Sequence, residues 1–141
     1  MEQITIADTI ERQDLATTTA DRPVREVVRM MTERHIGAVP VLDGEHLIGI
    51  ITERDVMTRV LDKGLDADTT AIGKVMTAAP RTVDPSLTIL EALAIMAEGG
   101  YRHLPVVVDG DLVAIISIRD LYAAVTGGLE EDILALTSGV M

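Results

Sequence analysis

The sequence predicts an α+β fold built from two similar units, each in the order β-α-β-β-α. The 141-residue chain repeats itself at an offset of 65 residues, which pairs Pro40 with Pro105 and Asp55 with Asp120. In each unit a helical segment precedes two β-rich runs that flank an Asp-Gly turn, a pattern typical of a hairpin. Hydrophobic residues make up 48% of the chain although Cys, Trp and Phe are absent, so we expect an aliphatic core.

The first unit reads directly in chain order. Its predicted elements are a short strand at the threonine run 17–19, a helix over 24–35, strands over 37–42 and 46–52, and a helix over 53–64. The turn between the two longer strands is Asp43-Gly44, and residues of this kind adopt the tight conformations that hairpins need.

The second unit repeats this order. A short strand at 82–84 ends at Pro85, and the sequence around Thr88 and Glu91 has capping-box spacing. The helix over 87–100 has its apolar residues at helical spacing and ends at Gly99-Gly100; these apolar residues are Leu87, Leu90, Leu93, Ala94 and Ala97. Strands over 103–108 and 111–117 and a helix from 118 to Gly127-Gly128 complete the unit.

The two units are expected to fold together. A unit of roughly 60 residues buries too little surface to be stable alone. We therefore expect the units to pack through their sheets about a pseudo-twofold axis, which leaves two related clefts between them. The first repeat is predicted to span residues 1–69 with an N-terminal segment, and the second 70–141 with a C-terminal tail.

The composition excludes several functions. A net charge of −11 and a pI near 4.5 argue against nucleic-acid binding, which needs a basic surface. No apolar run reaches the roughly 18–20 residues of a membrane span, and the acidic N-terminus does not resemble a signal peptide. Without Cys there are no disulfides or thiol chemistry, and the spacing of the three histidines does not suggest a metal site. We expect a soluble cytoplasmic protein.

Two copies of one motif are the first candidate for chemistry. Thr52-x-x-Asp55 and Ser117-x-x-Asp120 each follow the last strand and open the last helix of a unit. One interpretation is a helix cap, worth about 1 kcal/mol. The other is a nucleoside site, in which the carboxylate accepts the ribose hydroxyls while the side-chain hydroxyl and the helix N-terminus hold a phosphate. The two interpretations are compatible.

The duplicated runs HIGAVPVLDGEHLIGIITERD and YRHLPVVVDGDLVAIISIRD resemble the CBS-domain pair, or Bateman module, over nearly the whole chain. The resemblance implies adenosine-containing ligands in the clefts between repeats, and two modules paired into a flat dimer. It implies that Asp55 and Asp120, with the hydroxyls of Thr52 and Ser117, contact ribose and phosphate. No catalytic domain remains, so we expect no enzyme.

The two clefts are predicted to differ. In related modules a basic pair at the position of Arg102-His103 reaches the ligand phosphates, whereas the first repeat has Gly37-Ala38 there. The alternative is that Arg102 is solvated and His103 lies in the core. Arg54 and Arg119, inside the two motifs, could also bind phosphate or lie on solvated helix faces.

We predict tighter binding in the cleft that contains Asp120. Its base would lie against Ala16 and the backbone of Ile36, Gly37 and Ala38, while Arg81 replaces Ala16 in the cleft that contains Asp55.

The expected function is that of a regulatory module. It would sense an adenine nucleotide (AMP, ADP or ATP, the last with or without Mg²⁺), hold no tightly bound cofactor, and act on an unidentified partner protein or through its own oligomeric state. The alternatives are a sensor of S-adenosylmethionine or NAD, and a structural subunit with degenerate clefts, in which both aspartates are only caps.

Overall fold

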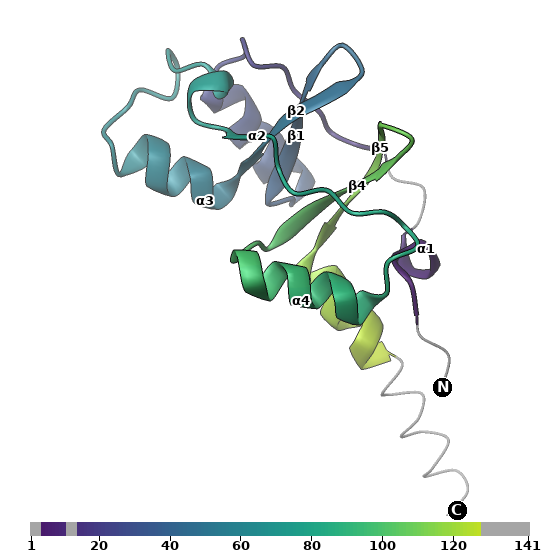
Figure 1. Ribbon diagram of the computed structural model, residues 1–141. Coiled ribbons are helices and arrows are strands. Elements are labelled where there is room, and N and C mark those ends of the chain that lie inside the picture. The colour runs from purple at the N-terminus through teal and green to yellow at the C-terminus, as the bar shows by residue number, and fades with distance from the viewer. Residues whose placement is uncertain (1–3, 11–13, 128–141) are drawn as a thin grey trace, which may run out of the picture.

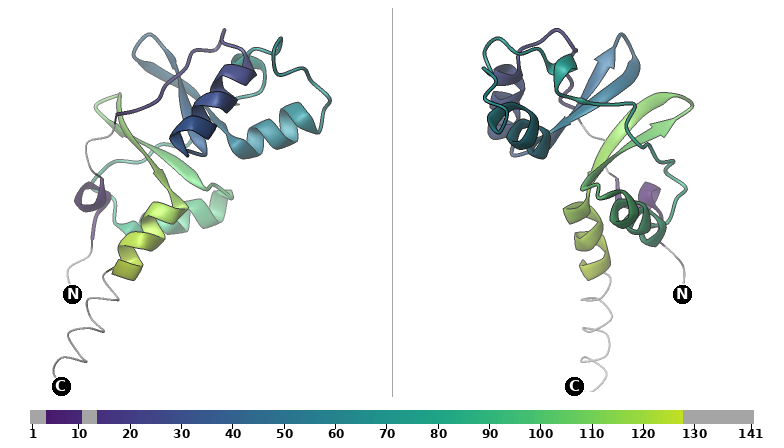
Figure 2. Two further views of the ribbon diagram at one scale, coloured as in Figure 1. Left: turned by 180° about the vertical axis from the view of Figure 1, so that it is seen from behind. Right: turned by 60° about the vertical axis from the view of Figure 1, so that its left-hand side comes forward.

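Each half of the chain folds as an antiparallel hairpin with helices packed against it (Figure 1). The computed structural model describes residues 4–10 and 14–127, and the C-terminal tail assigned to the second repeat lies outside them. The two hairpins lie side by side in the middle of the molecule, with β2 against β5 (Figure 2). This arrangement confirms the predicted α+β fold of two sheet-packed repeats.

The first repeat contains α2 (Val24–Arg34), β1 (Ala38–Asp43), β2 (His46–Thr52), α3 (Glu53–Asp55) and η1 (Val56–Leu61). The predicted strand at 17–19 is a single parallel bridge between Thr18 and Val41. The helix after β2 was predicted to reach residue 64. It ends at Leu61 and is π-helical from Val56, because backbone bonds such as Asp62 N–H to Met57 carbonyl span five residues.

The second repeat contains α4 (Ile89–Gly99), β4 (His103–Val108), β5 (Asp111–Ser117) and a helix over 118–127. The Thr88 hydroxyl accepts the Glu91 N–H at 3.1 Å, which confirms the predicted capping box. The helix accordingly begins at residue 89, two residues later than predicted. The short strand at 82–84 is again one parallel bridge, here between Val83 and Val106.

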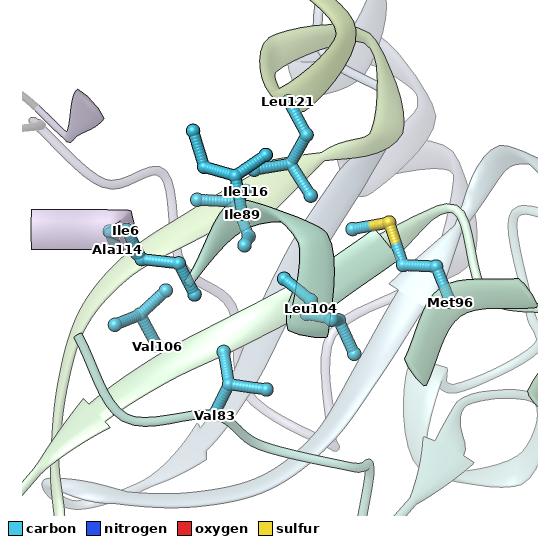
Figure 3. Close-up of a cluster of buried hydrophobic side chains, with 10 residues drawn as sticks. Ile6, Val83, Ile89, Met96, Leu104, Val106, Ala114, Ile116 and Leu121 are labelled. Carbon is cyan, nitrogen blue, oxygen red and sulfur yellow. The ribbon is translucent and has the colours of Figure 1, made fainter. Parts of the chain in front are cut away.

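Two hydrophobic cores lie on either side of the paired hairpins. The first core is built from α2, the β1–β2 hairpin and η1; its buried members are Val24, Val27, Met31, Val39, Val41, Ile51, Val60, Ile72 and Val75. Figure 3 shows the second core, whose members are Ile6, Val83, Ile89, Ala92, Met96, Leu104, Val106, Ala114, Ile116 and Leu121. Both are aliphatic, as the composition predicts.

Each core includes a segment from outside its own half of the sequence. Ile6, in α1 (Ile6–Thr9), is buried in the second core, and the Ile6 N–H donates to the Leu87 carbonyl. Ile72, in η2 (Ile72–Lys74), is buried in the first core, and the Ile72 N–H donates to the Arg22 carbonyl. Figure 1 shows α1 beside the second repeat. The division of the chain at residue 69 follows the sequence repeat and stays a prediction.

Three short elements were missed by the sequence analysis: α1, η2 and β3 (Thr77–Ala78). The last of these pairs with β2 through Gly49 and Ile50 and extends the first sheet to three strands. None of them has the length or periodicity that marks an element in sequence. Tertiary contacts hold such short elements in place.

Candidate ligand-binding cleft

A cleft of about 1210 Å³ lies between the two repeats. Its volume is slightly above the range of about 300–1,000 Å³ that is typical of small-molecule sites. The residues predicted for the Asp120 cleft all line it: Ala16, Ile36, Gly37, Ala38, Arg102, His103, Ser117, Arg119 and Asp120. Residues separated by about a hundred positions in the chain, such as Ala16 and Asp120, therefore line the same cavity.

Ser117 and Asp120 are fixed by reciprocal backbone bonds where β5 ends and the helix over 118–127 begins. The Ser117 N–H donates to Asp120 Oδ2 and the Asp120 N–H donates to Ser117 Oγ, both at 3.0 Å. This is the predicted cap. Asp120 is exposed, and its Oδ1 accepts no hydrogen bond from any residue that the structure describes. One carboxylate oxygen is thus available to a ligand in the cleft.

Arg102 and His103 enter the cleft at the start of β4. The Arg102 carbonyl accepts the Ile118 N–H at 2.8 Å, which ties β4 to the start of the last helix. His103 is partly buried, and this burial lowers the pKa of its imidazole below the ordinary 6.5. The carboxylates of Glu53 and Asp120 oppose that shift of the pKa, and Arg102 adds to it.

The opposite wall comes from the first repeat. Ala16 is buried, and Ile36, Gly37 and Ala38 precede or begin β1. A Cβ added at Gly37 would lie 3.0 Å from Glu53 Oε1 and 3.3 Å from His103 Cε1. A side chain at position 37 would therefore require the Glu53 carboxylate and the His103 ring to move by a few tenths of an ångström.

Glu53 also lines the cleft, and the sequence analysis did not select it. A signal was present: at the repeat offset the equivalent residue is Ile118, so the first copy of the motif carries a charge where the second is apolar. The charged and histidine side chains of the cleft are Asp14, Arg34, His35, Glu53, Arg102, His103, Arg119 and Asp120. Three arginines thus balance three carboxylates in this cleft, although the protein has a net charge of −11, and guanidinium groups suit phosphate.

The motif of the first repeat has different surroundings. Thr52 and Asp55 form the same cap, with bonds of 3.0 and 3.1 Å. The Thr77 hydroxyl also donates to the Asp55 carboxylate at 3.3 and 3.4 Å, and Arg59 Nε lies 3.7 Å from it. Asp55 is only 7% exposed. Arg54 is exposed, and none of Thr52, Arg54 and Asp55 lines the large cleft.

A smaller cavity of about 230 Å³ lies near the tips of the hairpins, and it contains none of the predicted site residues. Within residues 4–10 and 14–127, no three His, Asp or Glu side chains are grouped so as to hold a metal ion. The same part of the chain has no helix that is both long and apolar enough to cross a bilayer.

Comparison with known proteins identifies this architecture. The sequence matches the CBS domain family twice, over residues 6–62 and 72–127. It is 32% identical over 125 residues to the mitochondrial CBS domain-containing protein CBSX3 of Arabidopsis thaliana, covering 85% of this chain and 61% of the relative. The structure of a CBS-domain protein from Burkholderia ambifaria superposes with a TM-score of 0.81 at 36% identity, covering 85% and 90% of the two chains.

The two repeats and the cleft between them are thus those of a CBS-domain pair. The chain belongs to the CBS domain family. It spans about three fifths of the length of CBSX3 and about a fifth of another Arabidopsis thaliana relative, CBSCBSPB3. The structure of CBSX2 in complex with AMP has the same fold, with a TM-score of 0.73 at 22% identity over 88% of this chain and 97% of that one.

Proposed function

We propose that this chain is a regulatory module that binds an adenine nucleotide (AMP, ADP or ATP) in the Asp120 cleft. One observation carries the proposal: a capped carboxylate, a hydroxyl and the Arg102-His103 pair of the second repeat face a backbone wall of the first repeat. Such a cleft offers acceptors for ribose hydroxyls, cations for phosphate and an aliphatic surface for a base.

In this proposal each part of the ligand has its own residues. Asp120 accepts the ribose hydroxyls, and Ser117, Arg119, Arg102 and His103 hold the phosphates, with Mg²⁺ as an optional companion of ATP. The base lies against the first repeat, at Ala16, Ile36, Gly37 and Ala38. The AMP bound to CBSX2 supports this choice of ligand class. Because no Trp, Phe or Tyr is among the described residues that line the cleft, aliphatic and backbone groups hold the base in this proposal.

Occupancy of the cleft is coupled to the arrangement of the repeats, since the ligand contacts both. A ligand can shift such an equilibrium only by the difference between its affinities for the two arrangements. We propose that the altered arrangement is read by a partner protein or by the oligomeric state of the module.

We also propose that the module pairs with a second copy of itself through the helices that follow β2 and β5. Met57 and Tyr122 are equivalent at the repeat offset and are 59% and 56% exposed, and Leu61 and Val125 are exposed on the same two helices. Two related apolar patches suit a twofold interface, in which one surface meets its own copy. Tyr122→Glu should convert a dimer to monomers in light scattering, whereas a wild-type monomer would contradict this pairing.

We propose further that the module catalyses no reaction and that it lies in the cytoplasm. The matches are to CBS-domain proteins, and a Cys-free chain suits a reducing compartment. Turnover of ATP by the purified protein would overturn the first statement. Imaging of the tagged protein tests the second, for which mitochondrial CBSX3 provides the contrasting location.

A thermal-shift screen tests the ligand class. Because a ligand that binds only the folded state raises the unfolding temperature by mass action, AMP, ADP or ATP should raise it and adenine-free phosphate should not. A shift with S-adenosylmethionine or NAD alone would replace the nucleotide by one of those ligands. No shift with any of them would favour a structural subunit whose clefts are degenerate.

A further inference from the structure

We infer that Glu53 is a positioning residue that acts through His103: its carboxylate favours the imidazolium form, in which His103 binds the ligand phosphate as a cation. The inference rests on the proposed function and deepens it, since it concerns the phosphate-binding histidine of the Asp120 cleft. It assigns a role to a carboxylate of the first repeat that the proposed contacts with the ligand leave unused.

Glu53 is held in place by its backbone. It is the first residue of α3 and lines the cleft, and its N–H donates to the Gly37 carbonyl at 3.0 Å. Within the described parts of the chain, its side chain makes no hydrogen bond or ion pair. No other group in these parts therefore competes with its neighbours in the cleft for the negative charge.

The imidazole of His103 lies beside this carboxylate, across the boundary between the repeats. Glu53 Oε1 and His103 Cε1 lie 3.0 and 3.3 Å from one point, the place that a Cβ on Gly37 would take. Because Cε1 is the carbon between the two ring nitrogens, the polar edge of the ring approaches the first repeat. A positive charge on the ring thus has a carboxylate close to it, and an opposite charge at short range favours the charged form of a titratable group.

The charged groups that face His103 come from three elements. Glu53 of α3 and Asp120 of the last helix raise the pKa of the imidazole, Glu53 the more strongly, whereas burial and Arg102 of the adjoining backbone lower this pKa. The other charged or titratable side chains that line the cleft are Asp14, Arg34, His35 and Arg119. Because the proposed ribose contact engages Asp120, Glu53 is the carboxylate that remains to stabilise the imidazolium when a ligand is bound.

The two repeats differ at both members of this contact. At the repeat offset His103 corresponds to Ala38, and Glu53 corresponds to Ile118. The equivalent positions therefore hold two apolar residues where this contact has an acid and a base. The carboxylate thus accompanies the histidine in the cleft where the phosphate is proposed to bind, and the contact spans the two repeats that the ligand also bridges.

Phosphate binding is then linked to protonation of His103. A bound phosphate raises the pKa of the imidazole, so the complex retains a proton that the free protein releases. The contribution of His103 to affinity is fully present below its pKa in the free protein, and it is lost as the pH rises through its pKa in the complex. Because Glu53 raises both pKa values, it extends phosphate binding by His103 to higher pH.

NMR titration of the His103 Cε1 proton, identified as the signal absent from His103→Gln, measures this linkage with AMP as the ligand. AMP should raise the pKa of His103 by about one pH unit in the wild type. Glu53→Gln keeps the shape of the side chain and removes its charge, so it should lower the pKa of His103 by about half a pH unit or more, both free and with AMP. In calorimetry the affinity for AMP should fall at a correspondingly lower pH in this variant.

Asp14→Asn is the matched control, because Asp14 is an acidic residue of the same cleft and is not among the charges that shift the pKa of His103. It changes the net charge equally and should leave the pKa of His103 as in the wild type. An unchanged pKa in Glu53→Gln, or an equal fall in Asp14→Asn, would overturn the inference.

Two further outcomes would also overturn it. The first is an AMP affinity that Glu53→Gln changes by the same factor at every pH, because direct repulsion between the carboxylate and the phosphate would have that effect. The second is binding of AMP without a rise in the pKa of His103. Failure of AMP to bind the wild type would instead overturn the proposed function, and the pKa of His103 in the ligand-free variants would still test the action of Glu53.

Discussion

Asp55 and Asp120 occupy equivalent positions in the two repeats but differ in what surrounds their carboxylates. Both cap the helix that they open, with nearly identical bonds of 3.0–3.1 Å. Asp55 is in addition buried against Thr77 and Arg59, whereas Asp120 is exposed at a large cleft. At the repeat offset Arg59 is matched by Ala124, so the second repeat lacks this cation.

The difference shows that the motif alone does not define a ligand site. Capping accounts for the motif in both repeats, so the choice between a structural and a binding role depends on residues outside it. Thr77 comes from β3 and Arg59 from η1, and together they engage the acceptor that a ribose would need. The four predictions below test this division of roles, beginning with the largest expected effect.

Ligand binding should separate the two aspartates most strongly. Asp120→Ala removes a charged acceptor from the proposed ribose position and should weaken AMP binding about 30-fold or more. Asp55→Ala should leave the affinity within about threefold. Calorimetry measures both, and equal losses would contradict the asymmetry between the clefts.

The free energy of unfolding should fall more for Asp55→Ala than for Asp120→Ala, the reverse of their order in ligand binding. Asp55→Ala deletes a buried carboxylate that bonds to the Thr52 N–H and the Thr77 hydroxyl, so the free energy of unfolding should fall by about 2 kcal/mol. Asp120→Ala loses only an exposed cap and should cost about 1 kcal/mol or less. Urea denaturation of the two ligand-free variants is the measurement. A larger loss for Asp120→Ala would reverse the assignment.

Arg59→Ala makes the first repeat resemble the second at this position. The Arg59 guanidinium donates to the Val75 and Met76 carbonyls at 3.2 and 2.8 Å, besides lying near Asp55. Because the side chain is nearly half exposed, its loss should lower the free energy of unfolding by about 1 kcal/mol. Arg54→Ala, an exposed arginine of the same helix, is the control and should have no measurable effect in the same denaturation assay.

The smallest effect concerns pH. Burial lowers the pKa of His103 below 6.5 in the folded chain, so the unfolded chain binds more protons as the pH falls through 6.5. The free energy of unfolding should therefore decrease as the pH falls from 7.5 to the folded-state pKa of His103. At pH values below that pKa, His103 should cause no further decrease. The midpoint of urea denaturation, measured at several pH values, should follow this trend. The variant His103→Gln should have a smaller change of midpoint with pH. An unchanged pH dependence would show that His103 is not its source.

The sequence was sufficient for the fold because the two repeats reinforce each other. The hairpins follow from patterns that recur at one offset, and the capping box follows from the spacing of Thr88 and Glu91, whereas the residues of the Asp120 cleft came from the resemblance to the CBS-domain pair. The burial of Asp55 could not be predicted in this way. It depends on Thr77, in a two-residue strand with no periodicity of its own, and on Arg59, which lies four residues after Asp55 and also donates to the Val75 and Met76 carbonyls.

The exchange of Ile6 and Ile72 between the cores has a consequence for how the chain can be divided. A fragment ending at residue 69 would retain Ile6 without its binding site and lose the segment that closes its own core. A fragment beginning at residue 70 would lack Ile6 in its own core and would retain Ile72 without the first core that buries it. Each half of the chain therefore contributes a side chain to the core of the other, and the two halves should unfold in a single cooperative transition. Cleavage of the connecting segment should leave two fragments that stay associated until both unfold.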